Sequence, residues 1–280
     1  MLKQRIVTAV VLLALLVPAL LADHPLPFAA LTLLLIAAAG WEWARLNGVG
    51  GAAALASGAA VAAACGASAA VGWVERAPAL LWLLGALLWV GGGALALRAG
   101  PAGWPHLPRA LRWGLGLAAL WLAWLALAQS RATGLNFVLS VFCLVWVADI
   151  AAYFGGRTFG RRKLAPTISP GKSWEGVYSG VAGVLLLALG WLWLDHHLQL
   201  APSLYTRLHD AGGLVAVIVG SALLAAMSVV GDLVESLVKR AAGAKDSSGL
   251  LPGHGGVLDR VDALLPVFPI ALAGLGLARA

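Results

Sequence analysis

Charged residues are scarce in this chain. Asp, Glu, Lys and Arg make up 11% of its 280 residues, whereas a soluble domain carries about 25%. This scarcity excludes an ordinary soluble enzyme, and the 61% hydrophobic content excludes a disordered protein. A bilayer core of about 30 Å requires runs of about 20 apolar residues. The composition and the mean hydropathy of +0.90 therefore predict a polytopic helical membrane protein.

Cysteine is nearly absent, since the chain has only Cys65 and Cys143. Both lie in apolar runs, which favours small buried side chains over a disulfide or a metal pair and excludes a secreted disulfide scaffold. The chain also lacks the alternation of apolar and polar residues that is typical of a transmembrane β-barrel. Its net charge of +7 does not predict nucleic acid as a partner, because excess Lys and Arg in a membrane protein marks cytoplasmic loops.

Apolar runs between turn residues predict an all-α bundle of about nine membrane spans, with eight as the alternative count. The first run resembles a signal peptide, but its length and the Leu20 at position −3 favour an uncleaved helix. The third run is rich in Ala and Gly, whose small side chains let helices approach closely, so we expect it inside the bundle. The expected spans are 5–22, 26–46, 51–74, 78–98, 110–129, 134–154, 175–194, 212–238 and 261–278.

The basic residues predict the orientation of these spans. With nine spans and a cytoplasmic N-terminus, fifteen of the 19 Lys and Arg residues fall on the cytoplasmic side. Such an excess is typical of cytoplasmic loops, so we expect the N-terminus in the cytoplasm.

The acidic residues divide the chain into two parts. Only three of the twelve Asp and Glu residues precede residue 149. We therefore expect residues 1–130 to be scaffold helices and residues 131–280 to be the catalytic part, with polar clusters at 149–176 and 231–262.

The first polar cluster begins with Asp149 near the end of a predicted span. A carboxylate in a membrane helix is costly, so it needs a partner or a function, and a packing contact with an arginine is the structural alternative. Five glycines and five basic residues follow between 155 and 176. Glycine-rich backbone and basic side chains are suited to binding phosphate, although a loop that only sets topology would also be basic. The candidate phosphate-binding residues here are Arg157, Lys163, Ser169, Lys172 and Ser173.

The second polar cluster begins at the end of the eighth predicted span. Asp232, Glu235, Ser236 and Lys239 share one helical face, and Glu235 and Lys239 are spaced for an ion pair. A glycine-rich loop then leads to Asp259 and Asp262, which stand three residues apart.

Several carboxylates beside basic residues and glycines are typical of a site for Mg²⁺ and a nucleotide. Mg²⁺ prefers oxygen ligands and takes one or two carboxylates, with water and phosphate oxygens in its other positions. Zinc is not expected, because no cysteine or second histidine lies near His254 in the sequence. A core histidine is the alternative role for His254.

Two stretches resemble a known family. Residues 236–262 follow the pattern S-x2-K-R-x4-K-D-x-S-x2-L-P-x-H-G-G-V-x-D-R-V-D, which is similar to the signature of phosphatidate cytidylyltransferases, also called CDP-diacylglycerol synthases. Residues 149–176, with the Y-F-G-G-R and S-P-x-K-S-x-E-G runs, resemble the other polar region of that family. The first 148 residues match only in being hydrophobic.

The resemblance implies a nucleotidyltransferase of phospholipid biosynthesis, which makes CDP-diacylglycerol and pyrophosphate from CTP and phosphatidate with Mg²⁺, and with room for a second cation. It implies an integral protein of the bacterial inner membrane, with its site at the cytoplasmic face. The partners would be CTP, phosphatidate and membrane lipid, without nucleic acid. Gly and Ala on several spans are compatible with a homodimer.

Roles can be assigned to the polar residues as hypotheses. Asp232 and Asp259 are the first choices as metal ligands, and Asp246 and Asp262 the second. Together with Lys239 and Lys245, Asp232, Asp259 and Asp246 form the expected catalytic set. The basic residues of the second cluster would hold CTP phosphates, and backbone N–H groups of the Gly-rich loop would wrap phosphate. The remaining substrate-binding candidates are Ser236, Arg240, His254, Gly255, Gly256 and Arg260.

Two other functions remain open. Intramembrane acids are typical of an ion-coupled transporter, but the polar residues gather at one membrane face. Another lipid-phosphate transferase or kinase is the nearer alternative, although the helix pattern of CDP-alcohol phosphotransferases is missing. A purely structural membrane protein is disfavoured, because buried charges would destabilise it without a function.

Overall fold

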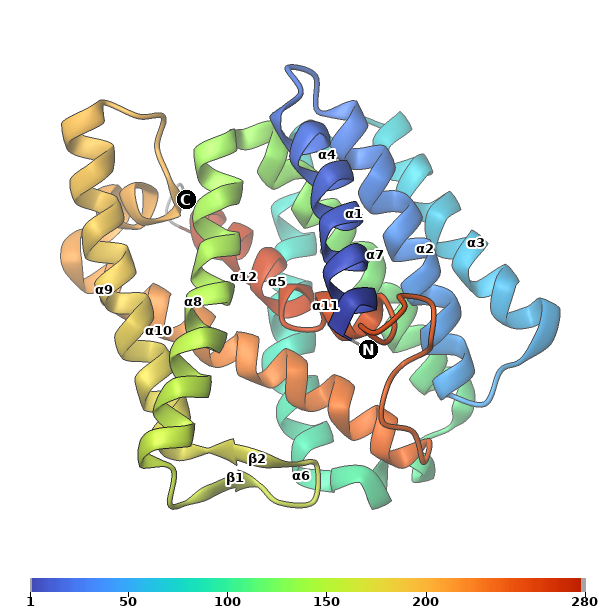
Figure 1. The fold of residues 1–280 in the computed structure, drawn as a ribbon. Coiled ribbons are helices and arrows are strands. Elements are labelled where there is room, and N and C mark those ends of the chain that lie inside the picture. The colour runs from blue at the N-terminus through green and yellow to red at the C-terminus, as the bar shows by residue number, and fades with distance from the viewer. Residues whose placement is uncertain (1, 278–280) are drawn as a thin grey trace.

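Seven helices in the described part of the chain are long and apolar enough to cross a bilayer. The computed structural model describes residues 2–277 and confirms an all-α polytopic bundle (Figure 1). Its helices are α1 (Leu2–Leu21), α2 (Leu26–Leu46), α3 (Gly51–Ala70), α4 (Trp73–Arg76), α5 (Ala79–Leu87), α6 (Gly93–Gly103), α7 (Arg109–Thr133), α8 (Leu135–Phe159), α9 (Trp174–Leu198), α10 (Leu204–Ala241), α11 (Leu258–Val261) and α12 (Leu264–Leu277). A π-helical turn, Leu88–Gly92, joins α5 to α6, so that Ala79–His106 forms one span.

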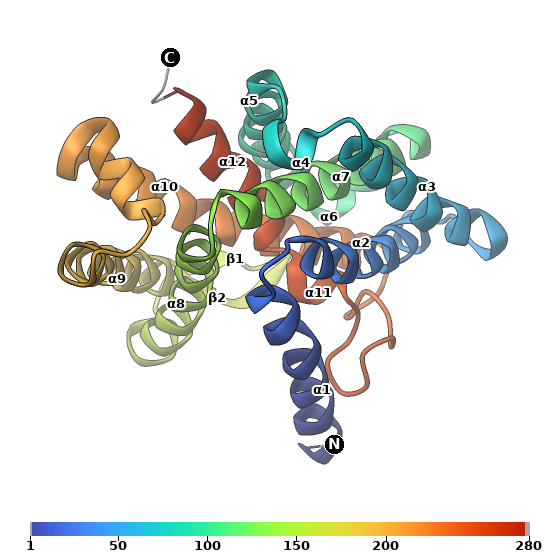
Figure 2. The same cartoon turned by 90° about the horizontal axis from the view of Figure 1, so that it is seen from above.

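The count of nine spans is wrong for residues 2–277. The last expected span, 261–278, corresponds to α12, which begins at Leu264 after the short helix α11 has ended at Val261, and residue 278 lies outside the described residues. At 1.5 Å per residue, the 14 residues of α12 reach about 21 Å, which is shorter than the bilayer core. Instead α12 is buried against α5, α7 and α10 in the middle of the bundle (Figure 2). The count is seven, or eight with the shorter apolar helix α1.

The position of α3 also differs from the expectation. Gly58 meets the backbone of α2, where a Cβ atom would clash with the carbonyl oxygen of Ala37. Small residues thus allow the close approach that the sequence predicts. Much of the rest of α3 is exposed, including Leu55, and α3 lies at the rim of the bundle (Figure 2). Its Ala-rich surface therefore faces outward.

A kink divides α10 into a short and a long piece. Gly212 and Gly213 have non-helical backbone angles, and the φ of Gly213 is 61°, which favours glycine. The expected span 212–238 begins at this kink. The long piece carries Asp232 to the end of the bundle where the polar loops gather (Figure 1).

A β-hairpin that the sequence did not predict closes the same end of the bundle (Figure 1). Strands β1 (Lys163–Ala165) and β2 (Ser169–Ser173) are antiparallel, with Lys163 opposite Ser173. Strand β2 leads directly into α9, and Ser173 accepts a hydrogen bond from the Gly176 N–H as the N-cap of that helix. The hairpin is therefore tied to the bundle at its end.

The indole of Trp43 fixes α2 against α7. Its Nε1 atom donates to the carbonyl oxygens of Arg112 and Trp113, and its ring lies where a Cβ atom on Gly116 would stand. The two helices are therefore held in one register by a buried side chain.

We expect Gly116→Ala to lower the free energy of unfolding by about 1–3 kcal/mol, because the added methyl group overlaps the buried indole. Gly114→Ala is the matched control, since nothing lies within 4 Å of its added Cβ atom. Thermal unfolding in detergent would compare the two. An equal response of both variants would contradict the proposed packing.

Candidate functional site

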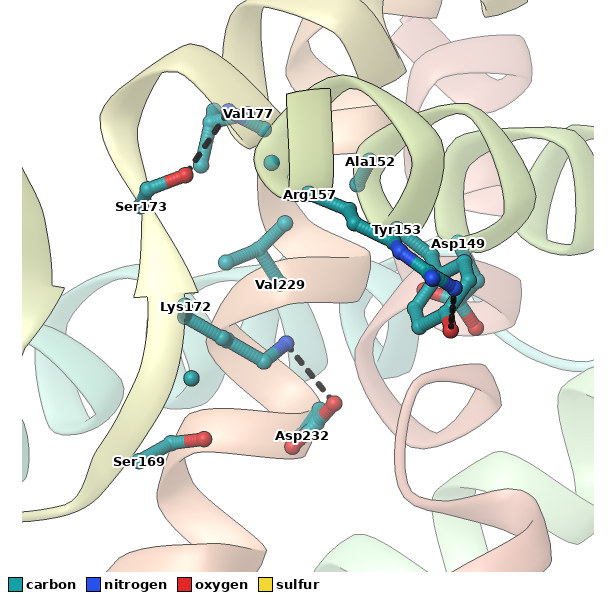
Figure 3. A pocket seen from close by; sticks show the side chains of 13 residues that line it. Asp149, Ala152, Tyr153, Arg157, Ser169, Lys172, Ser173, Val177, Val229 and Asp232 are labelled. Atoms are coloured by element: carbon teal, nitrogen blue, oxygen red, sulfur yellow. Dashed lines mark hydrogen bonds and ion pairs between the residues drawn. The ribbon is translucent and has the colours of Figure 1, made fainter. Parts of the chain in front are cut away.

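The two polar clusters of the sequence meet at a cavity of about 560 Å³. It lies between α8, the hairpin, α9 and α10 (Figure 3). Its walls combine charged, hydroxyl and glycine residues with three small apolar side chains. The lining residues are Asp149, Ala152, Tyr153, Gly156, Arg157, Ser169, Gly171, Lys172, Ser173, Gly176, Val177, Val229 and Asp232.

An ion pair across the cavity joins the two clusters. Lys172 on β2 lies with its Nζ atom 2.7 Å from Oδ2 of Asp232 on α10 (Figure 3). Ser236 donates to the other oxygen, Oδ1, at 3.2 Å. Both side chains of the ion pair are partly exposed, so a ligand in the cavity can reach them.

A second group lies on α8. Arg157 donates to the hydroxyl of Tyr153 at 3.3 Å, and both lie beside Asp149 (Figure 3). Asp149 interacts electrostatically with Lys172 and Asp232. Within residues 2–277 it forms no ion pair with an arginine, so the packing alternative is not supported.

Beyond this cavity, Lys239 lies between two carboxylates. Its Nζ atom is 2.6 Å from Oε2 of Glu235 and 2.6 Å from Oδ1 of Asp259. The spacing of Glu235 and Lys239 predicted the first ion pair, and the structure confirms it. All three side chains are largely shielded from solvent.

Asp259 organises the glycine-rich loop. Its Oδ2 atom accepts hydrogen bonds from the Ser247 N–H, the Ser247 hydroxyl and the Gly256 N–H at 2.7–2.9 Å. Burial acts to raise the pKa of Asp259, but the hydrogen bonds from Lys239 and these backbone groups outweigh it and lower the pKa to about 2. Its Oδ1 atom accepts a hydrogen bond from Lys239, and the Glu235 carboxyl also interacts with this side chain.

Asp262 is half-buried near Asp232. Gly231 allows this proximity, because a Cβ atom there would clash with the carbonyl oxygen of Asp262. Burial raises the pKa of Asp262, and the nearby Asp232 carboxylate raises it further. Two carboxylates held close together are suited to a cation.

Several expected phosphate-binding residues hold the backbone of the site. Arg260 donates to the carbonyl oxygen of His254 at 2.7 and 3.0 Å. Arg240 donates to the carbonyl oxygens of Ile168 and Ala244, and so connects the hairpin with the start of the loop. Gly255 adopts a φ of +82°, which lets the loop turn toward Asp259.

Only part of the expected site lines the cavity. The expected residues that line it are Arg157, Ser169, Lys172, Ser173 and Asp232. The others do not, and these include Asp259 and Lys239. Lys163 on the hairpin and Lys245 and Asp246 on the loop are exposed.

Sequence reasoning missed two carboxylates that shape the site. Glu175 accepts hydrogen bonds from the backbone of Arg161 and Arg162 and so fixes the hairpin. Glu42 is fully buried on α2 and accepts hydrogen bonds from the glycine-rich loop. The cost of an acid within an apolar span was the signal that would have identified Glu42.

The sequence is similar to those of known proteins. The model of the cytidylyltransferase family matches residues 3–277. The phosphatidate cytidylyltransferase of Pseudomonas aeruginosa is 40% identical over 278 residues, which cover 98% of this chain and 96% of that protein. The enzyme of the same name from Haemophilus influenzae is 49% identical over 136 residues, which cover 49% of this chain and 44% of that protein. The one from Brucella suis is 46% identical over 132 residues, which cover 47% of this chain and 44% of that protein.

Proposed function

The chain belongs to the phosphatidate cytidylyltransferase family, and from this premise we infer that it makes CDP-diacylglycerol and pyrophosphate from CTP and phosphatidate. The observation that carries the inference is the ion pair of Lys172 and Asp232, which joins both polar regions of the sequence at one cavity. The enzyme is an integral membrane protein, so its lipid substrate is present in the same bilayer.

The reaction does not require a strong general base. The nucleophile is a phosphate oxygen of phosphatidate, and a phosphate monoester has a second pKa of about 6, so it is largely ionised at neutral pH. It attacks the α-phosphorus of CTP, a new P–O bond forms, and the bond to the β-phosphate oxygen breaks to release pyrophosphate. The main barrier is the approach of two anions, so positioning and fixed positive charge dominate catalysis.

Two basic residues line the cavity, and further basic residues lie beyond it on α10 and the glycine-rich loop. We assign Lys172 and Arg157 to one phosphate-bearing substrate, with Ser169 and Ser173 beside them. Lys239 would face CTP phosphates, with Arg240, Lys245 and Arg260 as further candidates. These groups stabilise the charge that develops on the α-phosphate and on pyrophosphate.

The residues that the structure describes contain no group of three or more Asp, Glu, His or Cys side chains that could hold a metal ion. Two carboxylates, Asp232 and Asp262, interact electrostatically and offer the oxygen ligands that a divalent metal ion prefers. Asp259 lies beyond the cavity, hydrogen-bonded to Lys239. We propose Asp232 and Asp259 as the first ligands, with Asp262 and the exposed Asp246 as the second choices, which leaves room for a second cation. When bound, Mg²⁺ would neutralise phosphate charge and orient the phosphates.

We propose that the site faces the cytoplasm. The hairpin, the end of α10 and the end of α8 lie at one end of the bundle (Figure 1). The segments there, 155–176 and 239–245, are rich in Lys and Arg, as is typical of cytoplasmic loops. We also propose that residues 131–277 carry the site and that the helices before them support it. The expected homodimer stays a prediction.

One assay tests the proposed activity. Purified protein with phosphatidate, Mg²⁺ and CTP labelled in the cytidine is expected to give a labelled lipid and one pyrophosphate for each lipid formed. Omission of phosphatidate is the control and should leave both products absent. Pyrophosphate release without a labelled lipid, or solute transport in liposomes without CTP turnover, would contradict the proposal.

A further inference from the structure

We propose that Glu42, on α2, is a positioning residue that holds the signature loop, residues 243–257, in its active conformation. The proposal rests on the cytidylyltransferase activity inferred above, and it extends that activity to a residue outside the expected catalytic part.

The Glu42 side chain receives four hydrogen bonds from the far end of the sequence. Oε1 accepts from the Val257 N–H at 2.9 Å and from the Ser248 hydroxyl at 2.5 Å. Oε2 accepts from the Leu258 N–H at 2.7 Å and from the Ser247 hydroxyl at 3.1 Å. Glu42 is 0% exposed. One carboxylate therefore connects the middle of the signature loop to its end.

These contacts pass directly to the proposed metal ligand. The Ser247 N–H donates to Asp259, and the single hydroxyl proton of Ser247 is shared between Asp259 and Glu42, each within hydrogen-bond distance. Leu258 immediately precedes Asp259. Asp259 in turn accepts from Lys239. Glu42 thereby fixes the backbone from which Asp259 projects, although it lines no part of the cavity.

The space around Gly256 gives independent support. A Cβ atom on this residue would overlap Oε1 of Glu42 and the hydroxyl of Ser247. The glycine therefore allows the loop to close onto the carboxylate, and the loop and Glu42 are fitted to each other.

Glu42 itself stands on a rigid support. Its neighbour Trp43 is fixed against α7 by Gly116 and by two hydrogen bonds. One turn further on, the Asn47 side chain donates to the Trp43 carbonyl and accepts from the indole of Trp104. The position of Glu42 is thus set before the loop closes on it.

Glu42→Gln is the sharpest test. The Val257 and Leu258 N–H groups donate to different oxygens of Glu42, and an amide has only one oxygen, so one N–H must face the amide nitrogen. We expect kcat to fall about 10- to 100-fold, as for other residues that orient metal ligands, and half-saturation by Mg²⁺ to need a higher concentration. Hydrogen exchange should rise in residues 243–258.

Thr32→Val is the matched control, because it removes a buried hydroxyl from the same helix, one that donates to the carbonyl oxygens of Phe28 and Ala29 and, within residues 2–277, forms no hydrogen bond with the signature loop. We expect it to lower thermal stability and to leave the Mg²⁺ dependence and the exchange of residues 243–258 unchanged. Ser248→Ala provides a milder variant that keeps the carboxylate. It should lower kcat less than Glu42→Gln does. If Glu42→Gln does not fold, Ser248→Ala is the variant that tests the positioning role.

The outcomes separate the two proposals. If the wild-type protein transfers no cytidylyl group but Glu42→Gln alone raises exchange in the loop, the proposed activity fails and the positioning role stands. If the wild-type protein is active and the Glu42 and Ser248 variants match Thr32→Val in Mg²⁺ dependence and exchange, the positioning role is overturned.

Discussion

Asp232→Asn is expected to lower the rate of CDP-diacylglycerol formation by on the order of a thousandfold, about 4 kcal/mol of transition-state stabilisation. The asparagine keeps the size of the side chain but removes the negative charge. That charge pairs with Lys172 at 2.7 Å and, in our proposal, holds the metal ion. The loss should appear in kcat, and added Mg²⁺ should not restore it. The measurement is initial rate against Mg²⁺ concentration in detergent.

Asp210→Asn is the matched control for this experiment. Asp210 lies on the same helix, before the kink at Gly212, and it is exposed at the other end of the bundle. Its variant should keep the wild-type rate. If Asp232→Asn retains more than a tenth of the wild-type rate at saturating Mg²⁺, Asp232 is not a metal ligand.

Local features of the site followed from the sequence. The spacing of Glu235 and Lys239 predicted their ion pair, and the apolar run 175–194 predicted a helix that in the structure begins at Trp174. Such features depend on residues within one or two turns of each other, so helical periodicity is enough to predict them.

Contacts between distant segments did not follow in the same way. The ion pair between Lys172 and Asp232 joins residues 60 positions apart, and the bonds of Glu42 span more than 200 positions. Both depend on how the helices pack, which local periodicity does not determine. The two polar clusters could be predicted to share a membrane face, but not to face each other across one cavity.

The errors in the fold have a related cause. Apolar composition predicts that a segment leaves water, but it does not distinguish lipid from the protein interior. Thus α12 is apolar because it packs against α5, α7 and α10, and α3 is rich in alanine although much of it lies at the rim. Helix length distinguishes a membrane span from a buried helix better than composition does, since the 14 residues of α12 are too few to cross the bilayer core.

Lys239→Met is expected to have the second large effect, on stability as well as on activity. The variant keeps the length of the side chain and removes a largely buried cation from between Glu235 and Asp259. Removing one partner of a buried ion pair costs about 3–5 kcal/mol, because the remaining charges are left uncompensated. We expect a lower thermal unfolding temperature in detergent and a rate reduced at least a hundredfold, since Lys239 also faces the proposed CTP phosphates.

The double variant Glu235→Gln/Lys239→Met distinguishes the two roles of Lys239. Removing the Glu235 charge relieves one of the two uncompensated carboxylates, so much of the lost stability should return. The rate should stay low, because Asp259 still lacks its hydrogen bond from Lys239 and the substrate still lacks the positive charge. Recovery of both stability and rate would mean that Lys239 only neutralises Glu235. Recovery of stability alone would assign Lys239 to the reaction, with Glu235 setting the position of its ammonium group.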